Sequence, residues 1–414
     1  MRAGGVVGRR VRVSCALMII AALSGCGAVP TARPPIAVTP DGSTTKPASR
    51  TSSPSGPTAP TPAESFTADE TCTELVLSMS LSERVGQLLM VGVSSSGISE
   101  SEKAVIDRTR AGGVILLGNS RAGMEAISGV VSSVRNAARR PEGVEVMLAA
   151  DQEGGRVQRL KGPGFTRIPP ATIQARQSDA QLRRNAHDWG RQLKDAGIDA
   201  NLAPVADVVP MPLAWVNQPI AQLRRGYGSS PTMVAAKVAA FTEGMDRAGV
   251  ATAVKHFPGL GRVRGNTDFV SRVVDTRTRR HDAALAGFSA AVDAGADMVM
   301  VSSAFYRKID AEHKAAFSPM IIEEMLRKDL RFSGVVISDD LAAAAMRVVS
   351  AEDRARRFIS AGGDLLIIGD AGLATRMADA IKNEASDDPA FAKRVTSSAA
   401  RVVAMKQRRG LAHC

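Results

Sequence analysis

The sequence predicts a single (β/α)8 barrel, in which eight parallel strands alternate with helices around a closed sheet. Eight short apolar runs are separated by amphipathic stretches from Thr71 onward, and this alternation indicates a parallel sheet. Polar residues directly follow several of these runs, as is typical of the carboxyl ends of barrel strands. An open, doubly wound sheet is the alternative, but no Gly-x-Gly-x-x-Gly motif follows a strand to indicate a dinucleotide site.

The predicted elements follow one another in a regular order. The strands are residues 88–93, 113–117, 144–150, 200–205, 249–254, 298–301, 334–337 and 365–368. Apolar residues recur at helical spacing in residues 178–196, 231–248, 279–294 and 319–330. The last helix begins with Ser318-Pro319, a capping residue followed by proline in the first turn. Ser80, followed by Glu83, offers a similar cap and early acid before the first strand.

The first 25 residues have the features of a secretory signal peptide. A basic region comes first, formed by Arg2, Arg9, Arg10 and Arg12. The apolar stretch 13–23 that follows is too short to span a bilayer as a mature helix. Leu23-Ser-Gly-Cys26 resembles a bacterial lipobox, which predicts cleavage before Cys26 and its modification by lipid such as palmitate. A plain secretory signal with a chance cysteine is the alternative.

We therefore expect a lipoprotein whose folded body lies outside the cytoplasm, anchored to the cell membrane by acyl chains at Cys26. Residues 26–68 are rich in Pro, Ser and Thr and have almost no bulky apolar residues. Such a segment cannot bury enough surface to fold, so it is predicted to be a tether. Residues 69–414 then form one catalytic barrel, with no second domain.

Charge and cysteine content limit the partners. The formal net charge is +12, and loss of the signal peptide, with four arginines and no acid, lowers it to +8. The basic residues are spread along the chain and are not interleaved with aromatics, so nucleic-acid binding is not predicted. A solvated basic surface, or attraction to anionic lipid or cell-wall polymer, accounts for them. Cys72 and Cys414 can form a disulfide in an oxidising exterior, with two free thiols as the alternative.

Reactive side chains follow the predicted strands. Residues 249–254 lead into Lys255-His-Phe-Pro-Gly-Leu-Gly261, and Asp151, Asp207, Ser338-Asp-Asp340 and Asp370 follow other strands. Because these strand ends meet on one rim, they predict a polar pocket. Facing carboxylates are typical of glycosidic bond hydrolysis, in which one attacks and an acid protonates the leaving oxygen. Two Trp and two Tyr are too few for a long aromatic platform, so the pocket should hold one terminal sugar.

Three motifs, in the same order, resemble glycoside hydrolase family 3, and most of all its single-domain bacterial β-N-acetylglucosaminidases. They are Asp151-Gln-Glu-Gly-Gly-Arg-Val-Gln-Arg159, Lys255-His-Phe-Pro-Gly259 and Val336-Ile-Ser-Asp-Asp-Leu341. The resemblance runs from about Leu81 to Ile368. It implies a retaining exo-enzyme that forms a covalent glycosyl-enzyme intermediate. It would release terminal N-acetylglucosamine from peptidoglycan-derived fragments without a metal or organic cofactor, and we expect it to be a monomer.

The resemblance also assigns roles to residues. Asp339 matches the nucleophile of the Ser-Asp-Asp motif, and Asp340 is then a neighbour that orients or caps. The residues that match the family's sugar-binding positions are Asp151, Arg159, Arg225, Lys255 and His256. Arg225 matches through Arg225-Gly-Tyr-Gly228, a weaker version of the family's Arg-Ser-Phe-Gly.

The sequence departs from the family at the proton donor. The family has an Asp-Ser-His whose His is the acid/base, and this chain has Asn266-Thr-Asp268 at that spacing; Leu260 and Ser303 also replace histidines. Asp268 could itself be the acid/base, another group could serve, or the protein could mainly bind sugar with weak catalysis. Asp268 could also be a plain loop residue paired with a nearby arginine. A family 3 β-glucosidase or β-xylosidase is the alternative activity.

Overall fold

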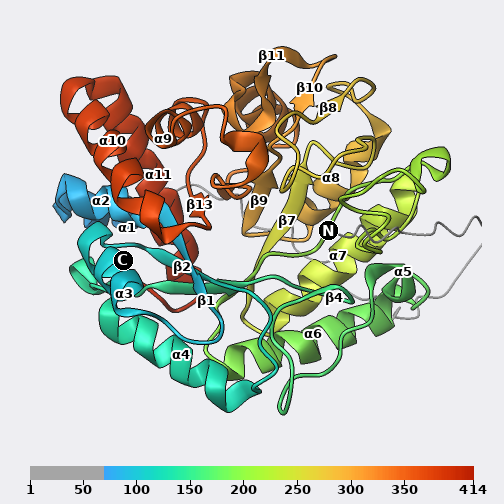
Figure 1. The fold of residues 1–414 in the computed structure, drawn as a ribbon, viewed down its shortest axis with the longest axis horizontal. Helices are drawn as coiled ribbons and strands as arrows, with labels where there is room; N and C mark the ends of the chain where they lie inside the picture. The colour runs from blue at the N-terminus through green and yellow to red at the C-terminus, as the bar shows by residue number, and fades with distance from the viewer. Residues whose placement is uncertain (1–69) are drawn as a thin grey trace, which may run out of the picture. The chain divides into compact units, whose positions relative to one another are not determined.

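The computed structural model describes residues 70–414, and these form a barrel of eight parallel strands surrounded by helices (Figure 1). The barrel strands are β1 (Leu89–Ser94), β2 (Gly113–Leu117), β3 (Met147–Ala150), β6 (Ala200–Asn201), β7 (Ala251–Phe257), β9 (Met298–Val301), β12 (Val335–Ser338) and β13 (Leu366–Ile368). Neighbouring strands pair in parallel from β13 through β1 to β12. A parallel bridge between Ile337 and Leu365 closes the ring. The (β/α)8 prediction is confirmed.

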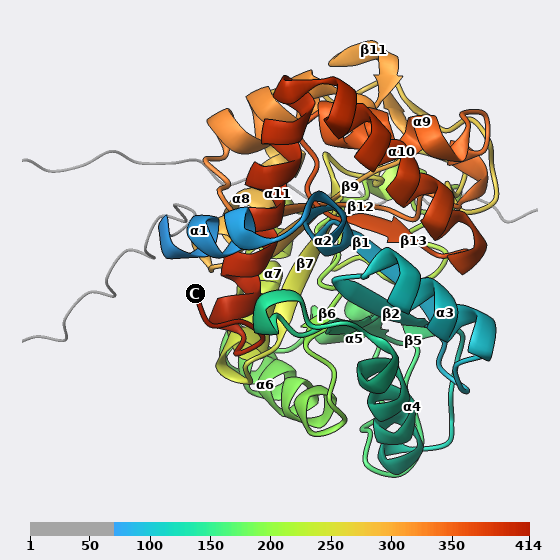
Figure 2. The ribbon, with the colours of Figure 1, turned by 90° about the vertical axis from the view of Figure 1, so that its left-hand side faces the viewer.

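Helices cover the outside of this ring (Figures 1 and 2). They are α1 (Glu70–Ser78), α2 (Leu81–Gln87), α3 (Glu100–Thr109), α4 (Met124–Ala137), α5 (Ala171–Gln174), α6 (Asp179–Asp195), α7 (Pro231–Arg247), α8 (Ala286–Asp293), a π-helical segment Met320–Asp329, α9 (Ala351–Ser360), α10 (Ala374–Asp387) and α11 (Pro389–Arg408). Ser80 and Glu83 form the capping box predicted at the start of α2. No helix in residues 70–414 is long and apolar enough to cross a membrane.

Some predicted boundaries were wrong. The strand predicted at 200–205 is only the two residues of β6, because Pro204 has no N–H to donate to a ladder. The helix predicted from 279 begins only after Asp282, whose carboxylate accepts a hydrogen bond from the backbone N–H of Ala284. Strand β7 runs on to Phe257, so Lys255 and His256 belong to the strand and not to the turn after it.

Three short strands extend from the loops on one side of the barrel: β8 (Val274–Asp275), β10 (Phe305–Tyr306) and β11 (Asp310–Lys314). A hairpin of β4 (Gln152–Gly154) and β5 (Val157–Gln158) follows β3. Both additions lie after carboxyl ends of barrel strands. They therefore shape the rim on which the predicted pocket residues lie.

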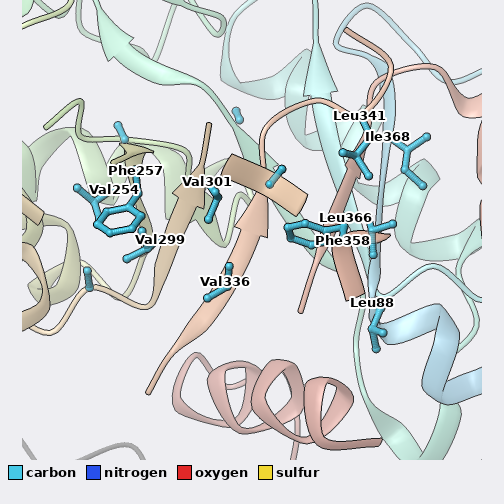
Figure 3. Packing of buried hydrophobic residues seen from close by; sticks show 14 of the residues in the cluster. Leu88, Val254, Phe257, Val299, Val301, Val336, Leu341, Phe358, Leu366 and Ile368 are labelled. Atoms are coloured by element: carbon cyan, nitrogen blue, oxygen red, sulfur yellow. The ribbon is translucent and has the colours of Figure 1, made fainter. Parts of the chain in front are cut away.

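Alternate residues on each strand enter two different cores. On β9, Met298 and Met300 point into the barrel, while Val299 and Val301 pack outward beneath the helices. Figure 3 shows Val299 and Val301 beside Val336 of the neighbouring strand in this outer core. Full burial of such a side chain contributes about 1.5–3 kcal/mol, so the outer core fixes the strands that carry the site.

The two ends of the described chain are joined. Cys72 of α1 and Cys414 form a disulfide with an S–S distance of 1.97 Å, as the sequence predicted. The predicted signal peptide, the predicted lipidation site Cys26 and the predicted tether at 26–68 lie outside the described residues.

Candidate active site

A cavity of about 400 Å³ opens at the carboxyl ends of the barrel strands. Apolar side chains such as Met300 and Ile367 line it together with charged ones. Every residue that the sequence predicted for catalysis or sugar binding lines this one cavity: Asp151, Arg159, Arg225, Lys255, His256, Asp268 and Asp339. The barrel thus brings together residues that are up to 188 positions apart in the chain.

A buried network of four charges lies at one side of the cavity. The Lys255 ammonium lies 2.6 Å from an Asp151 carboxylate oxygen and 2.7 Å from Glu153. Arg225 donates two hydrogen bonds to the two Glu153 oxygens, at 2.7 and 2.9 Å. Burial alone would raise the pKa of Glu153, but Arg225 and Lys255 hold it far below its usual range. Such charge-assisted, bidentate contacts hold these side chains in fixed positions.

The second cluster is a buried Asp–His pair. His256 Nδ1 lies 2.7 Å from Asp207 Oδ2. Asp207 Oδ1 accepts hydrogen bonds from the backbone N–H groups of His256 and Leu260, at 3.3 and 2.7 Å. This one carboxylate therefore fixes both the imidazole ring and the loop that leaves β7.

An irregularity in the sheet explains why two consecutive residues line the cavity. Neighbouring residues of a strand normally point to opposite faces. Here Lys255 pairs with Met300 and Phe257 pairs with Val301, so His256 is an extra residue on β7. Such a bulge re-aims side chains beside a site, and both Lys255 and His256 line the cavity.

Asp339 follows β12, is half-buried, and has no cationic ion-pair partner among residues 70–414. The net pKa of Asp339 is raised to about 6. Burial is the main cause, and the charge of Asp268 also raises the pKa, whereas the nearby His256 lowers it. Its Oδ1 accepts a hydrogen bond from the backbone N–H of Asp340 at 2.9 Å. At neutral pH this carboxylate is therefore mostly ionised and poorly neutralised, as a nucleophile requires.

Asp340 has a different position. Its Oδ1 accepts hydrogen bonds from the backbone N–H groups of Ala342 and Gly369, each at 2.8 Å. A side chain on Gly369 would meet the Asp340 carboxylate at 2.5 Å. Asp340 thus ties the end of β12 to the end of β13, which agrees with the orienting role implied by the sequence.

The loop with Asp268 is a tight turn built by Asn266. The Asn266 side-chain oxygen accepts the backbone N–H of Asp268 at 3.0 Å, and its carbonyl oxygen accepts those of Phe269 and Val270. Asp268 is exposed and Phe269 is 80% exposed, although both line the cavity. Arg262 pairs with Asp282 instead, so Asp268 is not held by that arginine.

Comparison with known proteins places this architecture in a family. The model of the glycosyl hydrolase family 3 N-terminal domain matches residues 80–405. This chain belongs to glycosyl hydrolase family 3. It is therefore a glycosidase.

Relatives within family 3 are similar over most of their length. The β-hexosaminidase of Stenotrophomonas maltophilia strain K279a is 32% identical over 293 residues, which are 68% of this chain and 83% of the relative. The solved β-N-acetylhexosaminidase of Beutenbergia cavernae DSM 12333 has a TM-score of 0.78 and 43% identity, and the match covers 80% of this chain and 99% of that one. A family 3 β-N-acetylglucosaminidase from Paenibacillus sp. strain FPU-7 has a TM-score of 0.74 and 27% identity, over 81% and 64% of the two chains.

Two important residues of this family 3 site were not predicted as site residues. Glu153 lies at the centre of the charge network, and Asp207 was noted only as a strand-end carboxylate. The spacing Asp151-Gln-Glu153 offered a signal for Glu153, because side chains two positions apart in an extended chain can face the same way. No group of three or more His, Cys, Asp or Glu in residues 70–414 is arranged to hold a metal ion.

Proposed function

We propose that this glycosidase is a retaining exo-β-N-acetylglucosaminidase that removes terminal β-linked N-acetylglucosamine from peptidoglycan-derived fragments. The observation that carries the proposal is the single cavity that unites Asp339, Asp268 and the sugar-binding positions. The 43% identity to a β-N-acetylhexosaminidase supports the N-acetyl sugar. The lipobox at Cys26 supports action at the outer face of the cell membrane, beside the cell wall.

In this proposal Asp339 attacks the anomeric carbon and forms the covalent glycosyl-enzyme. Asp268 gives its proton to the leaving oxygen, and then takes a proton from the water that releases the sugar. A carboxylate at position 268 would repel phosphate, so water is the expected acceptor. The network of Lys255, Asp151 and Arg225 holds the hydroxyl groups of the terminal sugar.

The position of Asp268 supports this role in two ways. Its charge is close enough to raise the pKa of Asp339, as expected for two carboxylates on either side of one bond. Its loop is anchored, because the carbonyl oxygens of Thr267 and Asp268 accept backbone N–H groups of Ala345 and Ala344, at 3.1 and 3.3 Å. The loop therefore rests on the chain that follows Asp339.

Hydrolysis of aryl β-N-acetylglucosaminide by the soluble body, residues 69–414, tests the proposal. We expect turnover, with a preference over aryl β-glucoside and β-xyloside, and loss of turnover in Asp339→Ala. Asp370→Ala is the matched control, because this strand-end carboxylate caps residues 371–373 and does not line the cavity. Full activity in Asp339→Ala, or a preference for the glucoside, would contradict the proposal.

Azide rescue tests the proton donor. Asp268→Gly should lose about 10²–10⁴-fold in rate on substrates with poor leaving groups, and much less on activated aryl glycosides. Azide should restore the rate and yield the β-glycosyl azide, as a retaining enzyme without its acid/base does. If the variant loses nothing even on poor leaving groups, Asp268 is not the acid.

A further inference from the structure

Two loops beside the cavity are joined by their backbones. The backbone N–H of Ser120, after β2, donates to the Arg159 carbonyl oxygen at 2.9 Å, and Lys161 donates to that of Ser120 at 3.0 Å. Gly162 allows the close approach, because its φ is +100° and a side chain there would meet the Arg121 carbonyl oxygen at 2.3 Å. The loops after β2 and β3 therefore present their side chains as one surface.

This surface gathers five cations, which we call the cationic rim: Arg121, Arg156, Arg159, Lys161 and Arg167. Burial lowers the pKa of Lys161, and the charges of Arg121, Arg159 and Arg167 lower it further. Each of these three arginines thus lies within electrostatic reach of Lys161. Lys161 has a neutral partner, the Asn119 side-chain oxygen at 3.2 Å.

Little negative charge balances the cationic rim. Its one ion pair within residues 70–414 joins Arg159 to Asp151 at 3.9 Å, and Asp151 already binds Lys255 at 2.6 Å. Arg121, Arg156 and Arg167 are exposed and have no ion pair in that part of the chain. Some exposed arginines elsewhere do have an acidic partner, such as Arg139 with Asp107. A cluster of like charges disfavours the folded state and attracts anions.

The cationic rim is continuous with the active site. Arg156 and Arg159 line the cavity, and Arg121, Lys161 and Arg167 lie on the same two joined loops without lining it. Guanidinium groups bind carboxylate and phosphate groups with paired hydrogen bonds. A substrate whose sugar occupies the cavity would place its next substituents near these guanidinium groups.

We propose that the cationic rim is a binding site for an anionic group, a carboxylate or a phosphate, carried by the same glycan whose terminal sugar is hydrolysed. This inference rests on the proposed function, since it takes the cavity to hold the sugar. Binding of the anionic group makes the enzyme selective for anionic glycans over neutral ones of the same length.

The test compares two double variants of the soluble body. Arg121→Gln/Arg167→Gln removes two charges of the cationic rim, and Arg108→Gln/Arg331→Gln removes two exposed, unpaired arginines that do not line the cavity. The substrates are aryl β-N-acetylglucosaminide, its 6-phosphate, and the N-acetylglucosaminyl-N-acetylmuramic acid disaccharide as free lactyl carboxylate or as methyl ester. The readout is the ratio of kcat/KM for each anionic substrate to that for its neutral counterpart.

We expect this ratio to fall about tenfold in the rim variant, on the scale of two lost charge contacts, and to stay unchanged in the control. The wild-type ratio should also fall with added salt. A fall for the phosphate alone, or for the lactyl carboxylate alone, identifies the source of the anion. Equal ratios in both variants for both anions would overturn the inference.

Two further outcomes separate this inference from its alternatives. If the rim variant differs only in weaker binding to vesicles with anionic phosphatidylglycerol, the cationic rim is a membrane contact and the inference is wrong. If the wild type hydrolyses none of the substrates, the proposed function fails. Calorimetric titrations with N-acetylglucosamine 6-phosphate and with N-acetylglucosamine then test separately whether the cationic rim binds an anionic group. Equal affinities for the two sugars would overturn the inference.

Discussion

The two ends of the barrel differ in how they treat buried carboxylates. At the amino ends of the strands, Asp199, Asp297 and Asp364 are each paired with basic side chains and accept a backbone N–H from a residue within or next to a strand. At the carboxyl ends, Asp339 is half-buried, and within residues 70–414 its carboxylate has only a backbone N–H as a hydrogen-bond partner. The buried carboxylates at the amino end hold the fold together through their paired contacts. Asp339 at the carboxyl end has no cationic partner in the described chain.

The amino end shows the stabilising arrangement most fully at Asp364. This carboxylate contacts the guanidinium groups of Arg327 and Arg401, the latter at 3.0 Å. It also accepts the Ser398 hydroxyl and the Val336 backbone N–H, both at 2.8 Å. A buried charge with every oxygen occupied costs little as long as no partner is removed.

The carboxyl end shows the opposite arrangement at Asp339. The raised pKa means that ionising this carboxyl group in the folded protein costs free energy relative to the unfolded chain. The shift from 3.8 to about 6 corresponds to about 3 kcal/mol. Reactive residues commonly reduce stability in this way, and the comparison of the two ends makes the cost measurable.

Substitution of each aspartate by asparagine should give the largest and most opposite effects. Asp339→Asn should lower kcat at least about 10³-fold and raise the free energy of unfolding at pH 7 by up to about 3 kcal/mol. Asp364→Asn should instead lower the free energy of unfolding by about 3–5 kcal/mol, because it leaves two partly buried arginines without their carboxylate. Chemical denaturation with parallel assays of folded protein measures both.

The pH dependence supplies the control. The loss of stability caused by ionising Asp339 is absent below about pH 4 and complete above about pH 6, because the pKa of Asp339 is higher in the folded than in the unfolded protein. The stability gain of Asp339→Asn should therefore disappear at pH 4. A gain that persists unchanged at pH 4, or an equal loss of activity per folded molecule in Asp364→Asn, would contradict the division between the two ends.

Glu153 sharpens the comparison. It lies at the carboxyl end of the barrel, but it is paired with basic side chains in the same way as the aspartates at the amino end. Glu153→Gln should lower the free energy of unfolding by about 3 kcal/mol, since Arg225 loses its carboxylate, and should also raise KM. Glu125→Gln is the matched control on an exposed residue of α4 without an ion pair in the described chain. Unchanged stability with a raised KM would make Glu153 a binding residue alone.

Much of the fold could be read from the sequence because its signals are local. Alternating apolar runs placed all eight strands, and the limits of 113–117 and 298–301 were correct to the residue. The end of the strand predicted at 249–254 was placed too early, because Lys255 and His256, which precede its last residue Phe257, are charged or polar. Their burial depends on Asp151, Glu153 and Asp207, which lie in the segments after β3 and β6 and give no signal near residues 255–256.

The site was predicted in part for the same reason. The motifs identified the residues that line the cavity, because each motif is continuous in the chain. Glu153 and Asp207 act through contacts with partners 49 to 102 positions away, so only the folded structure shows what they hold. The cationic rim likewise depends on the pairing of two loops through Ser120, which no periodicity indicates.

The disulfide tests whether stability and catalysis separate along the molecule. Cys72→Ser/Cys414→Ser should lower the free energy of unfolding by about 2–5 kcal/mol, since the bond closes a very long loop in the unfolded chain. Turnover of aryl β-N-acetylglucosaminide at 25 °C should stay within twofold, because neither cysteine lines the cavity. Thermal unfolding with and without reductant measures the first effect. A matching loss of turnover in folded protein would show that the chain ends influence the site.

The smallest expected effect concerns the pH profile of the catalytic end. Activity should fall below about pH 6 as Asp339 becomes protonated. Asp268→Asn removes a negative charge that raises this pKa, so the acid limb of kcat/KM should move to lower pH by less than one unit. An activated aryl substrate keeps the rate measurable, because its leaving group does not need the acid. If the limb stays in place or moves to higher pH, Asp268 and Asp339 are not electrostatically coupled, and the carboxyl end does not derive its reactivity from uncompensated charge.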